Sequence, residues 1–269
     1  MREIGHAHEV SSAGDRLDEH LVSLLAPASF AAERYRVFRH TVEQMHKDAD
    51  IRLFAITSPT VGDGKTTTAI NLAGALAQAS DARVLLVDAD LRRGQVRNDL
   101  ALSDSGEAGL AEAILNAELP LKEVVRRCGD FNLFVLPAGR CPAAPYEALK
   151  SPRLGQLIQE ARHEYDYVVV DTAPLLPVPD TRMIAKWVDG FFMVVAAHRT
   201  RRRMVEEAFD MIDSAKMLGV VFNGDDCPMS SYSSYGYGLY GLGQPENGNR
   251  GRRWRWIGRT SGRVERRTS

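Results

Sequence analysis

The stretch SPTVGDGKTTT, residues 58–68, lies between two segments of different character. The apolar run 53–56 (LFAI) before it is typical of a buried strand, and the run 69–77 (AINLAGALA) after it is typical of a helix. Gly62 and Gly64 can adopt positive φ, so the backbone N–H groups around them can point at one anion, next to the positive end of the helix. Strand, glycine-rich turn and helix together predict a phosphate loop that binds a nucleotide.

The residues of this loop have defined expected roles. Lys65 would contact the β- and γ-phosphates, and the hydroxyl of Thr66 would bind Mg²⁺. The full set expected to bind the nucleotide here is Gly62, Asp63, Gly64, Lys65, Thr66 and Thr67. One position departs from the P-loop formula, because Pro59 stands six residues before the lysine, where the formula has Gly or Ala. A chance turn followed by a lysine is the alternative interpretation, and the flanking strand and helix disfavour it.

Composition indicates a globular protein with an ordinary core. The 269 residues are 44% hydrophobic and 26% charged, which suits one large α/β domain or two small ones. A formal net charge of −1 gives no reason to expect a nucleic-acid partner. Three scattered cysteines, Cys128, Cys141 and Cys227, form no C-x-x-C pair and fit a reducing compartment. Residues 1–20 are unlike a signal peptide, and the longest apolar run, 191–197, is too short to span a bilayer, so we expect a cytoplasmic protein.

Two further apolar runs end in acidic residues. The run RVLLVD ends at Asp88 and is followed by Asp90, and the run YVVVD ends at Asp171. Open α/β sheets bind their ligands at the carboxyl ends of the strands, so these three aspartates are candidates for the nucleotide site. Asp171 resembles the Walker B aspartate that orients Mg²⁺. An acidic turn that closes a strand is the alternative for Asp88 and Asp90.

The remaining patterns predict an alternation of strands and helices. Strands are expected at 131–136, 191–197 and 218–222, separated mostly by helical segments. This order predicts a doubly wound, mainly parallel α/β sheet. An amphipathic helix is expected over 28–47, before the first strand.

That helix carries an E-x-x-R-x-x-R array formed by Glu33, Arg36 and Arg39. By itself the array fits a solvent-exposed face with an internal ion pair, which contributes little to stability.

The C-terminal part of the chain has a different composition. Residues 230–243 read SSYSSYGYGLYGLG, with few aliphatic residues to bury, and hold four of the eight tyrosines. These four are Tyr232, Tyr235, Tyr237 and Tyr240. Their spacing fits neither a helix nor a strand, so they form either a low-complexity tail or a set of accessible phosphate acceptors. Residues 250–269 contain eight arginines and one glutamate, which makes this end strongly basic.

In combination these features resemble the bacterial tyrosine kinases (BY-kinases) of the separate cytoplasmic type, which serve capsule and exopolysaccharide production. The resemblance extends from about residue 28 to residue 240, and its most specific motifs are D-x-D-x-R and the tyrosine cluster. In chain order the motifs are the E-x-x-R-x-x-R helix, the phosphate loop, LLVDADLR ending at Arg92, LPAG ending at Gly139, VVVDTAP ending at Pro174, LGVVFN ending at Asn223, and the tyrosine cluster.

The resemblance implies a P-loop NTPase fold with deviant Walker motifs, and autophosphorylation on tyrosine with ATP and Mg²⁺ as cofactors. Lys65 would hold the phosphates and Asn223 would contact the adenine. Asp88 would orient or deprotonate the acceptor hydroxyl, although Asp88 and Asp90 could exchange roles. The residues expected to bind Mg²⁺, directly or through water, are Thr66, Asp90 and Asp171.

The resemblance also implies partners. Glu33, Arg36 and Arg39 would mediate a ring-like homo-oligomer in which one subunit presents its tyrosines to the next. A transmembrane polysaccharide co-polymerase or adaptor would activate the kinase, which we therefore expect at the inner face of the cell membrane. The basic residues after 243 depart from the family, where the tyrosine cluster is close to the terminus. They could bind anionic lipid headgroups, fold back on the phosphorylated segment, or be solvated chain.

The expected organisation is a flexible leader over 1–27, a kinase domain over 28–228, a tyrosine-rich tail over 229–243 and a basic disordered extension over 244–269. Two alternatives with the same fold stay open. A partitioning or positioning ATPase would use hydrolysis as a dimer switch, but usually has a second lysine where this chain has Thr60. A catalytically weak scaffold is the other alternative, and Pro59 is its support.

Overall fold

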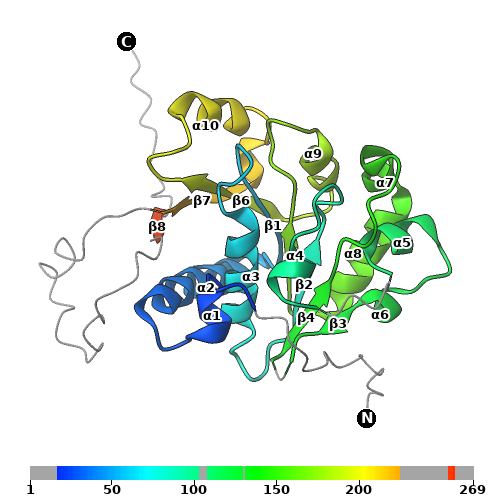
Figure 1. The fold of residues 1–269 in the computed structure, drawn as a ribbon, viewed down its shortest axis with the longest axis horizontal. Coiled ribbons are helices and arrows are strands. Elements are labelled where there is room, and N and C mark those ends of the chain that lie inside the picture. Colours follow the sequence, from blue (N-terminus) through cyan, green and yellow to red (C-terminus); the bar gives the residue numbers. More distant parts are fainter. Residues whose placement is uncertain (1–16, 103–107, 130, 225–253, 258–269) are drawn as a thin grey trace, which may run out of the picture.

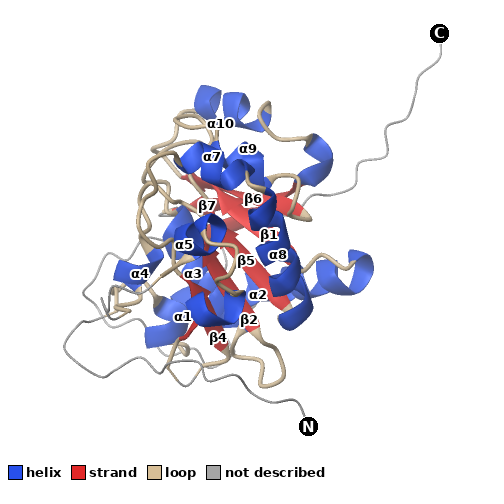
Figure 2. Cartoon of the chain, turned by 90° about the vertical axis from the view of Figure 1, so that its right-hand side faces the viewer, coloured by secondary structure: helices blue, strands red, loops and turns tan. Residues whose placement is uncertain are grey.

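The computed structural model describes residues 17–102, 108–129, 131–224 and 254–257, which form one sheet with helices on both faces (Figures 1 and 2). The strands are β1 Leu53–Thr57, β2 Val84–Asp88, β3 Arg126–Arg127, β4 Leu133–Leu136, β5 Tyr167–Asp171, β6 Gly190–Ala196, β7 Met217–Asn223 and β8 Trp254–Ile257. The helices are α1 Val22–Leu25, α2 Phe30–Ala49, α3 Lys65–Leu76, α4 Val96–Asp99, α5 Leu110–Leu115, α6 Leu121–Val124, α7 Pro145–Lys150, α8 Pro152–Glu164, α9 Asp180–Ile184 and α10 Arg202–Phe209, with a 3₁₀ turn, η1, at Ser214–Lys216.

The order of the strands brings the three predicted acidic and phosphate-binding segments together. Across the eight-stranded sheet the order is β3-β4-β2-β5-β1-β6-β7-β8. All pairings between β4 and β7 are parallel, and only the two edge strands β3 and β8 pair antiparallel. Strand β5 lies between β1 and β2, and Asp88 is directly opposite Asp171. The predicted doubly wound, mainly parallel sheet is confirmed.

The strands are buried on both faces because each face is covered by its own helices. Leu53 and Ala55 of β1 belong to a core that includes residues of α5, α7, α8 and α10. Phe54 and Ile56 point the other way, into a core with α1, α2, α3 and α4. All residues of β1, β2, β5 and β6 are buried. This explains why these strands are unbroken apolar runs in the sequence rather than alternating ones.

Residues 17–27, before α2, are folded, which corrects the expectation of a flexible leader over 1–27 for this part of it. Leu21 and Leu24 are buried in the core beside α3. The Asn71 side chain of α3 accepts a hydrogen bond from the Ser23 backbone N–H (2.9 Å) and donates one to the carbonyl of His20 (2.9 Å). The ordered domain therefore begins by residue 17, and residues 1–16 lie outside the described part of the chain.

The C-terminal extension also differs in part from expectation. Residues Trp254–Ile257 form β8, antiparallel to β7, with Trp254 opposite Asn223. An unpaired sheet edge offers free backbone donors and acceptors, and β8 fills this one. For these four residues the expectation of a disordered extension is corrected. The remainder of 244–269 and the whole tyrosine-rich tail, 229–243, lie outside the described residues.

Within the described ranges, no helix has both the length and the apolar character needed to cross a membrane.

Replacing Leu21 with Ala tests the packing of the leader. We expect the Leu21→Ala substitution to lower the free energy of unfolding by about 2–4 kcal/mol, because it empties a fully buried site. Leu25 of the same helical turn is 49% exposed, so Leu25→Ala should cost less than about 0.5 kcal/mol. Equilibrium unfolding in urea measures both. Equal midpoints for Leu21→Ala and the unsubstituted protein would contradict the packing of this segment on α3.

Candidate functional site

The phosphate loop connects the carboxyl end of β1 to the start of α3. Gly62 and Gly64 have φ values of 83° and 92°, in the left-handed region that favours glycine. A Cβ atom at Gly64 would lie 1.8 Å from Nδ2 of Asn223, so only glycine fits at this position. α3 begins at Lys65 and directs its N-terminal N–H groups into the turn. The loop therefore has the form of an anion-binding cradle.

Contacts from outside the loop hold this shape. The buried Asp63 carboxylate accepts hydrogen bonds from the Thr60 N–H (2.9 Å), the Thr60 hydroxyl (3.0 Å) and the Thr200 hydroxyl (2.6 Å). Nδ2 of Asn223 donates to the Asp63 carbonyl (2.9 Å), and the Arg199 guanidinium donates to the carbonyl of Gly62. The Asp63 carboxylate thus stabilises the loop itself. Only the backbone N–H of Asp63 is left to donate a hydrogen bond to phosphate.

Pro59, where the chain departs from the P-loop formula, contacts the segment that follows β5. Its carbonyl accepts a hydrogen bond from the Leu176 N–H (3.2 Å), and the Ser58 carbonyl accepts one from the Leu175 N–H (2.8 Å). The start of the loop is therefore fixed to the segment that follows β5.

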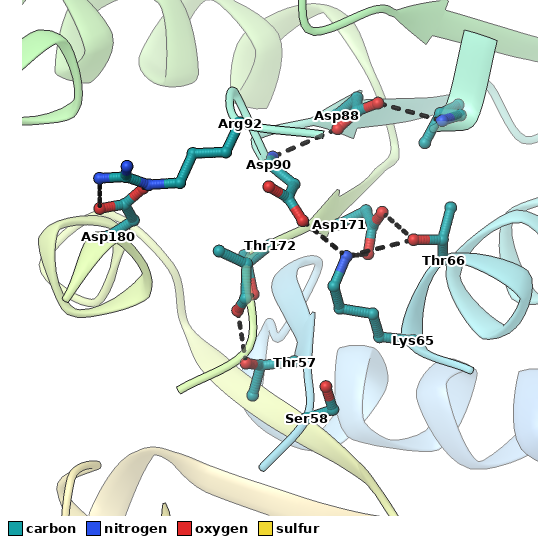
Figure 3. Close-up of polar contacts among 12 residues, drawn as sticks. Thr57, Ser58, Lys65, Thr66, Asp88, Asp90, Arg92, Asp171, Thr172 and Asp180 are labelled. Carbon is teal, nitrogen blue, oxygen red and sulfur yellow. Dashed lines mark hydrogen bonds and ion pairs between the residues drawn. The ribbon is translucent and has the colours of Figure 1, made fainter. Parts of the chain in front are cut away.

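Lys65 lies among carboxylates that come from two neighbouring strands (Figure 3). Its Nζ is 3.0 Å from Oδ2 of Asp90 and 3.6 Å from Oδ1 of Asp171. The Thr66 hydroxyl is 3.2 Å from the same Nζ and donates to Oδ2 of Asp171 (2.7 Å). Asp90 and Asp171 are almost completely buried. The geometry thus joins the phosphate loop to the ends of β2 and β5.

Asp88 has a different environment from the other two aspartates. Its side chain is fully buried, Oδ1 accepts from the Asp90 N–H (3.2 Å) and Oδ2 accepts from the Val96 N–H (3.1 Å). Both oxygens therefore hold the backbone of the loop after β2. Each oxygen keeps a lone pair for a second hydrogen bond, so these contacts do not by themselves exclude an incoming hydroxyl.

The pKa shifts of this cluster follow from burial and charge. Burial alone would lower the pKa of Lys65, but the charges of Asp171 and Asp90 outweigh it and raise the pKa above its ordinary value. Burial, followed by repulsion from Asp171, raises the pKa of Asp88 well above the ordinary carboxyl range. Burial also raises the pKa of Asp171, against the opposing charge of Lys65. The Lys65 ammonium therefore opposes the rise in the pKa of Asp88 and Asp171 that burial causes.

The donor set fits a hard divalent cation together with phosphate. Oδ2 of Asp90 and Oδ1 of Asp171 are buried, and within the described chain neither accepts a hydrogen bond of regular geometry. With the Thr66 hydroxyl they offer oxygen atoms, which Mg²⁺ prefers. Among the described residues, no group of three or more His, Cys, Asp or Glu side chains is arranged to hold a metal alone. Phosphate and water oxygens would complete the coordination, as is usual for Mg²⁺.

The structure brings together most of the predicted site residues, but not all. Lys65, Thr66, Asp88, Asp90 and Asp171 lie at one edge of the sheet, as described above. Asn223 reaches the same loop from the end of β7 and uses its amide N–H on Asp63. The four tyrosines Tyr232, Tyr235, Tyr237 and Tyr240 lie outside the described residues. Their role and that of Asn223 stay predictions.

Glu33, Arg36 and Arg39 lie on α2, away from the phosphate loop. Arg36 pairs with Glu33 and donates to the Pro27 carbonyl (2.5 Å). Arg39 pairs with Glu43 (2.6 Å) and donates to the Ala75 carbonyl of α3 (3.0 Å). Arg39 therefore joins two helices of one subunit, whereas Glu33 and Arg36 are about 40% exposed. Their role in self-assembly stays a prediction.

The structure adds residues that the sequence patterns do not single out. Thr200 and Arg199 follow β6 and hold the phosphate loop, and Asp180 of α9 forms two hydrogen bonds with Arg92 (Figure 3). None of these belongs to a recognisable motif. Only Arg92, as the last residue of D-x-D-x-R, carries a signal in the sequence.

Comparison with known proteins identifies relatives of the whole described domain. A family model described as an AAA domain matches residues 51–186. Tyrosine-protein kinase YwqD of Bacillus subtilis is 33% identical over 226 residues, which cover 83% of this chain and 93% of that protein. The succinoglycan biosynthesis transport protein ExoP of Rhizobium meliloti is 34% identical over 216 residues, 78% of this chain but 27% of ExoP.

Solved structures agree with these relatives. The kinase domain of the Escherichia coli tyrosine kinase ETK superposes with a TM-score of 0.71 at 29% identity, over 78% of this chain and 82% of that domain. A ParA family ATPase from Chlorobium tepidum superposes less closely, with a TM-score of 0.55 at 23% identity, over 68% of this chain and 78% of that one. The second likeness shows a common fold only.

Replacing Lys65 with Met tests the electrostatic description of the site. Lys65 lowers the pKa of Asp88 and Asp171, so its removal raises both. A carboxyl whose folded pKa is raised contributes stability below its unfolded pKa and loses that contribution as the pH rises through the folded pKa. We therefore expect Lys65→Met to cost about 3 kcal/mol near pH 8 and clearly less near pH 5.

Urea unfolding of the nucleotide-free protein at the two pH values measures this difference. The control is Lys122→Met, because Lys122 is an exposed lysine of α6, remote from the cluster. A stability loss for Lys65→Met that is independent of pH would contradict the idea that the ammonium neutralises the aspartates.

Proposed function

The chain belongs to the bacterial tyrosine-protein kinase family, and we propose that it is an ATP-dependent autokinase that phosphorylates the tyrosines of its C-terminal segment in a second copy of itself. The observation that carries this proposal is the cluster of Lys65, Thr66, Asp90 and Asp171 at the phosphate loop. The process served is capsule or exopolysaccharide synthesis and export, as the name of the succinoglycan biosynthesis transport protein ExoP suggests.

Each residue of the cluster has a role in phosphoryl transfer. Lys65 would leave its carboxylates and bind the β- and γ-phosphate oxygens, with the backbone N–H groups of residues 62–66 around them. Thr66, Asp90 and Asp171 would hold Mg²⁺, which neutralises the charge that develops on the phosphates. Asn223, which ends β7 beside the loop, would contact the adenine.

The acceptor hydroxyl needs orientation more than a strong base. A free tyrosine has a pKa near 10, so a carboxylate removes its proton poorly before transfer begins. Positioning and charge neutralisation supply most of the rate enhancement in phosphoryl transfer. Asp88 would orient or deprotonate the hydroxyl, although Asp88 and Asp90 could exchange roles. Each Asp88 oxygen accepts one backbone N–H hydrogen bond and keeps a lone pair for the hydroxyl.

The acceptors in this proposal are Tyr232, Tyr235, Tyr237 and Tyr240. Each phosphate would add roughly 1.5 to 2 negative charges, so four would add roughly 6 to 8 to one segment. Charge of this size would separate neighbouring segments or prevent their return to an active site. Self-assembly and phosphorylation would then oppose one another and form a cycle.

The proposal includes partners outside the chain. ExoP, which is named a transport protein, is longer than this chain, and the chain matches 27% of it. A separate transmembrane co-polymerase or adaptor would supply the remaining functions and recruit the kinase to the inner face of the membrane. Contact of the basic residues after 243 with anionic lipid is part of the same proposal and would show as salt-sensitive pelleting with anionic vesicles.

The competing functions with this fold are less well supported. The ParA likeness is weaker than the kinase likeness in TM-score and identity, and the position of the second lysine of such ATPases is Thr60 here. A catalytically weak scaffold would not need the ion pairs of Lys65, which the chain retains in spite of Pro59.

Autophosphorylation is tested directly by an anti-phosphotyrosine blot of purified protein with ATP and Mg²⁺, in the presence of an adaptor. We expect a strong signal for the unsubstituted chain and at least a hundredfold weaker one for Lys65→Met, because the phosphates lose their main cationic contact. A variant with all four cluster tyrosines changed to Phe should also lose the signal. It is the matched control for the acceptors, since its phosphate loop is intact. A signal that survives Lys65→Met would overturn the kinase proposal.

Self-assembly through α2 is tested by light scattering after gel filtration. We expect Glu33→Ala with Arg36→Ala to reduce an oligomer to monomers, because both side chains are partly exposed and their loss leaves the packing of α2 unchanged. Arg203→Ala with Glu207→Ala is the control, because it removes an exposed ion pair of the same kind on α10. The same mass for both double variants would rule out this face of α2.

A further inference from the structure

The first turn of α9 contacts both acidic loops of the site. Arg92, two residues after Asp90, donates from Nε to Oδ2 of Asp180 (2.7 Å) and from Nη2 to Oδ1 (3.1 Å) (Figure 3). The next residue of α9, Thr181, donates its hydroxyl to the Ala173 carbonyl (2.6 Å). Ala173 is two residues after Asp171. One helical turn therefore supports the segments that follow β2 and β5.

The loop that carries Asp90 is a tight turn in which Arg92 and Arg93 are exposed. The N–H groups of Arg93 and Gly94 both donate to the Asp90 carbonyl, at 3.0 and 2.8 Å. Rotation of this turn would move the Arg92 side chain and the Asp90 carboxylate together. A constraint on the Arg92 guanidinium is therefore a constraint on the carboxylate that contacts Lys65.

The Arg92–Asp180 pair is more constrained than a typical ion pair on a protein surface. Asp180 is 1% exposed, and the Arg92 guanidinium gives each of its oxygens one hydrogen bond. Two parallel bonds fix the orientation of a guanidinium as well as its distance. Arg92 itself is 40% exposed, so packing alone does not hold it in place. Among the described residues, Asp180 is the carboxylate within ion-pair distance of Arg92.

We propose that Asp180 is a positioning residue for phosphoryl transfer: it holds Arg92, and through this turn it fixes Asp90 against Lys65. Thr181 supports the Asp171 side of the site in the same way. This inference rests on the proposed kinase activity, because it assigns to α9 the task of placing the two aspartates that would bind Mg²⁺. α9 thus adds a side-chain connection between these two segments to the backbone hydrogen bond from the Ala89 N–H to the Asp171 carbonyl (2.8 Å).

The experiment compares Asp180→Asn, Arg92→Ala and the double variant in the full chain. Three quantities are measured: kcat and KM for ATP in autophosphorylation, binding of a fluorescent ADP analogue with and without Mg²⁺, and the thermal midpoint. We expect each variant to lower kcat about tenfold and to weaken the enhancement of ADP binding by Mg²⁺, while binding without Mg²⁺ stays the same. Because the two residues act as one unit, the double variant should be no slower than the slower single variant.

The controls separate positioning from general stability. Asp189→Asn breaks an ion pair with Arg162 (2.6 Å) near the start of β1, away from the phosphate loop. It should lower the thermal midpoint without changing the Mg²⁺ dependence. Arg92→Lys keeps the charge but not the two parallel bonds, and we expect it to recover only part of kcat.

The outcomes are distinct. A double variant with unchanged kcat and unchanged Mg²⁺ dependence would overturn the proposal, and so would multiplicative losses in kcat from the two single variants. If a single variant does not fold because it leaves a buried charge unpaired, the double variant removes both charges and decides the question alone. Absence of activity in the unsubstituted protein would instead contradict the kinase proposal, whereas the ADP-binding measurement would still report on Asp180.

Discussion

The arrangement of the site depends on one buried ammonium group, that of Lys65, among several carboxylates. Lys65 approaches Asp90 and Asp171 within 3.0 and 3.6 Å, in a region where burial disfavours charge on every group. The Lys65 charge lowers the pKa of Asp88 and Asp171 against the effect of burial. The charges of Asp171 and Asp90 in turn raise the pKa of Lys65, which burial alone would lower. Magnesium-bound triphosphate would bind to these same carboxylates and to this same ammonium. One set of charges would therefore serve both the stability of the fold and the proposed chemistry.

A second constraint is that the phosphate loop obtains its shape from its neighbours as well as from its own sequence. Thr200 and Arg199 hold it from the end of β6, and Asn223 holds it from the end of β7. Asp63 accepts two of these contacts, one at its carboxylate and one at its backbone carbonyl. External support of this kind makes the first position of the loop less critical, which is consistent with Pro59 in place of the usual glycine. The departure from the formula is therefore compatible with a complete cradle.

Much of the fold and the centre of the site could be predicted from the sequence, because both depend on local signals. Buried parallel strands read as apolar runs, and the acids that end them mark the edge of the sheet where ligands bind. Contacts between distant residues give no such signal. The Arg92–Asp180 pair joins positions 88 residues apart, and α9 is only five residues long, too short for a visible period. The prediction of a flexible leader was wrong for residues 17–27 for a related reason. Leu21 and Leu24 are too few apolar positions to indicate a buried segment.

The position of Asn223 connects the nucleotide loop with the segment that carries the tyrosines. Its amide bonds to the Asp63 carbonyl, and its backbone is opposite Trp254 in the pairing of β7 with β8. The described residues that flank 225–253 therefore meet at one point of the sheet edge, next to the phosphate loop. Tyr232 is nine residues beyond Asn223, so an extended chain gives it a reach of at most about 30 Å. In the proposed function, a nucleotide that altered the loop would act on Asn223 directly and, through it, on the start of the segment that holds the proposed acceptors.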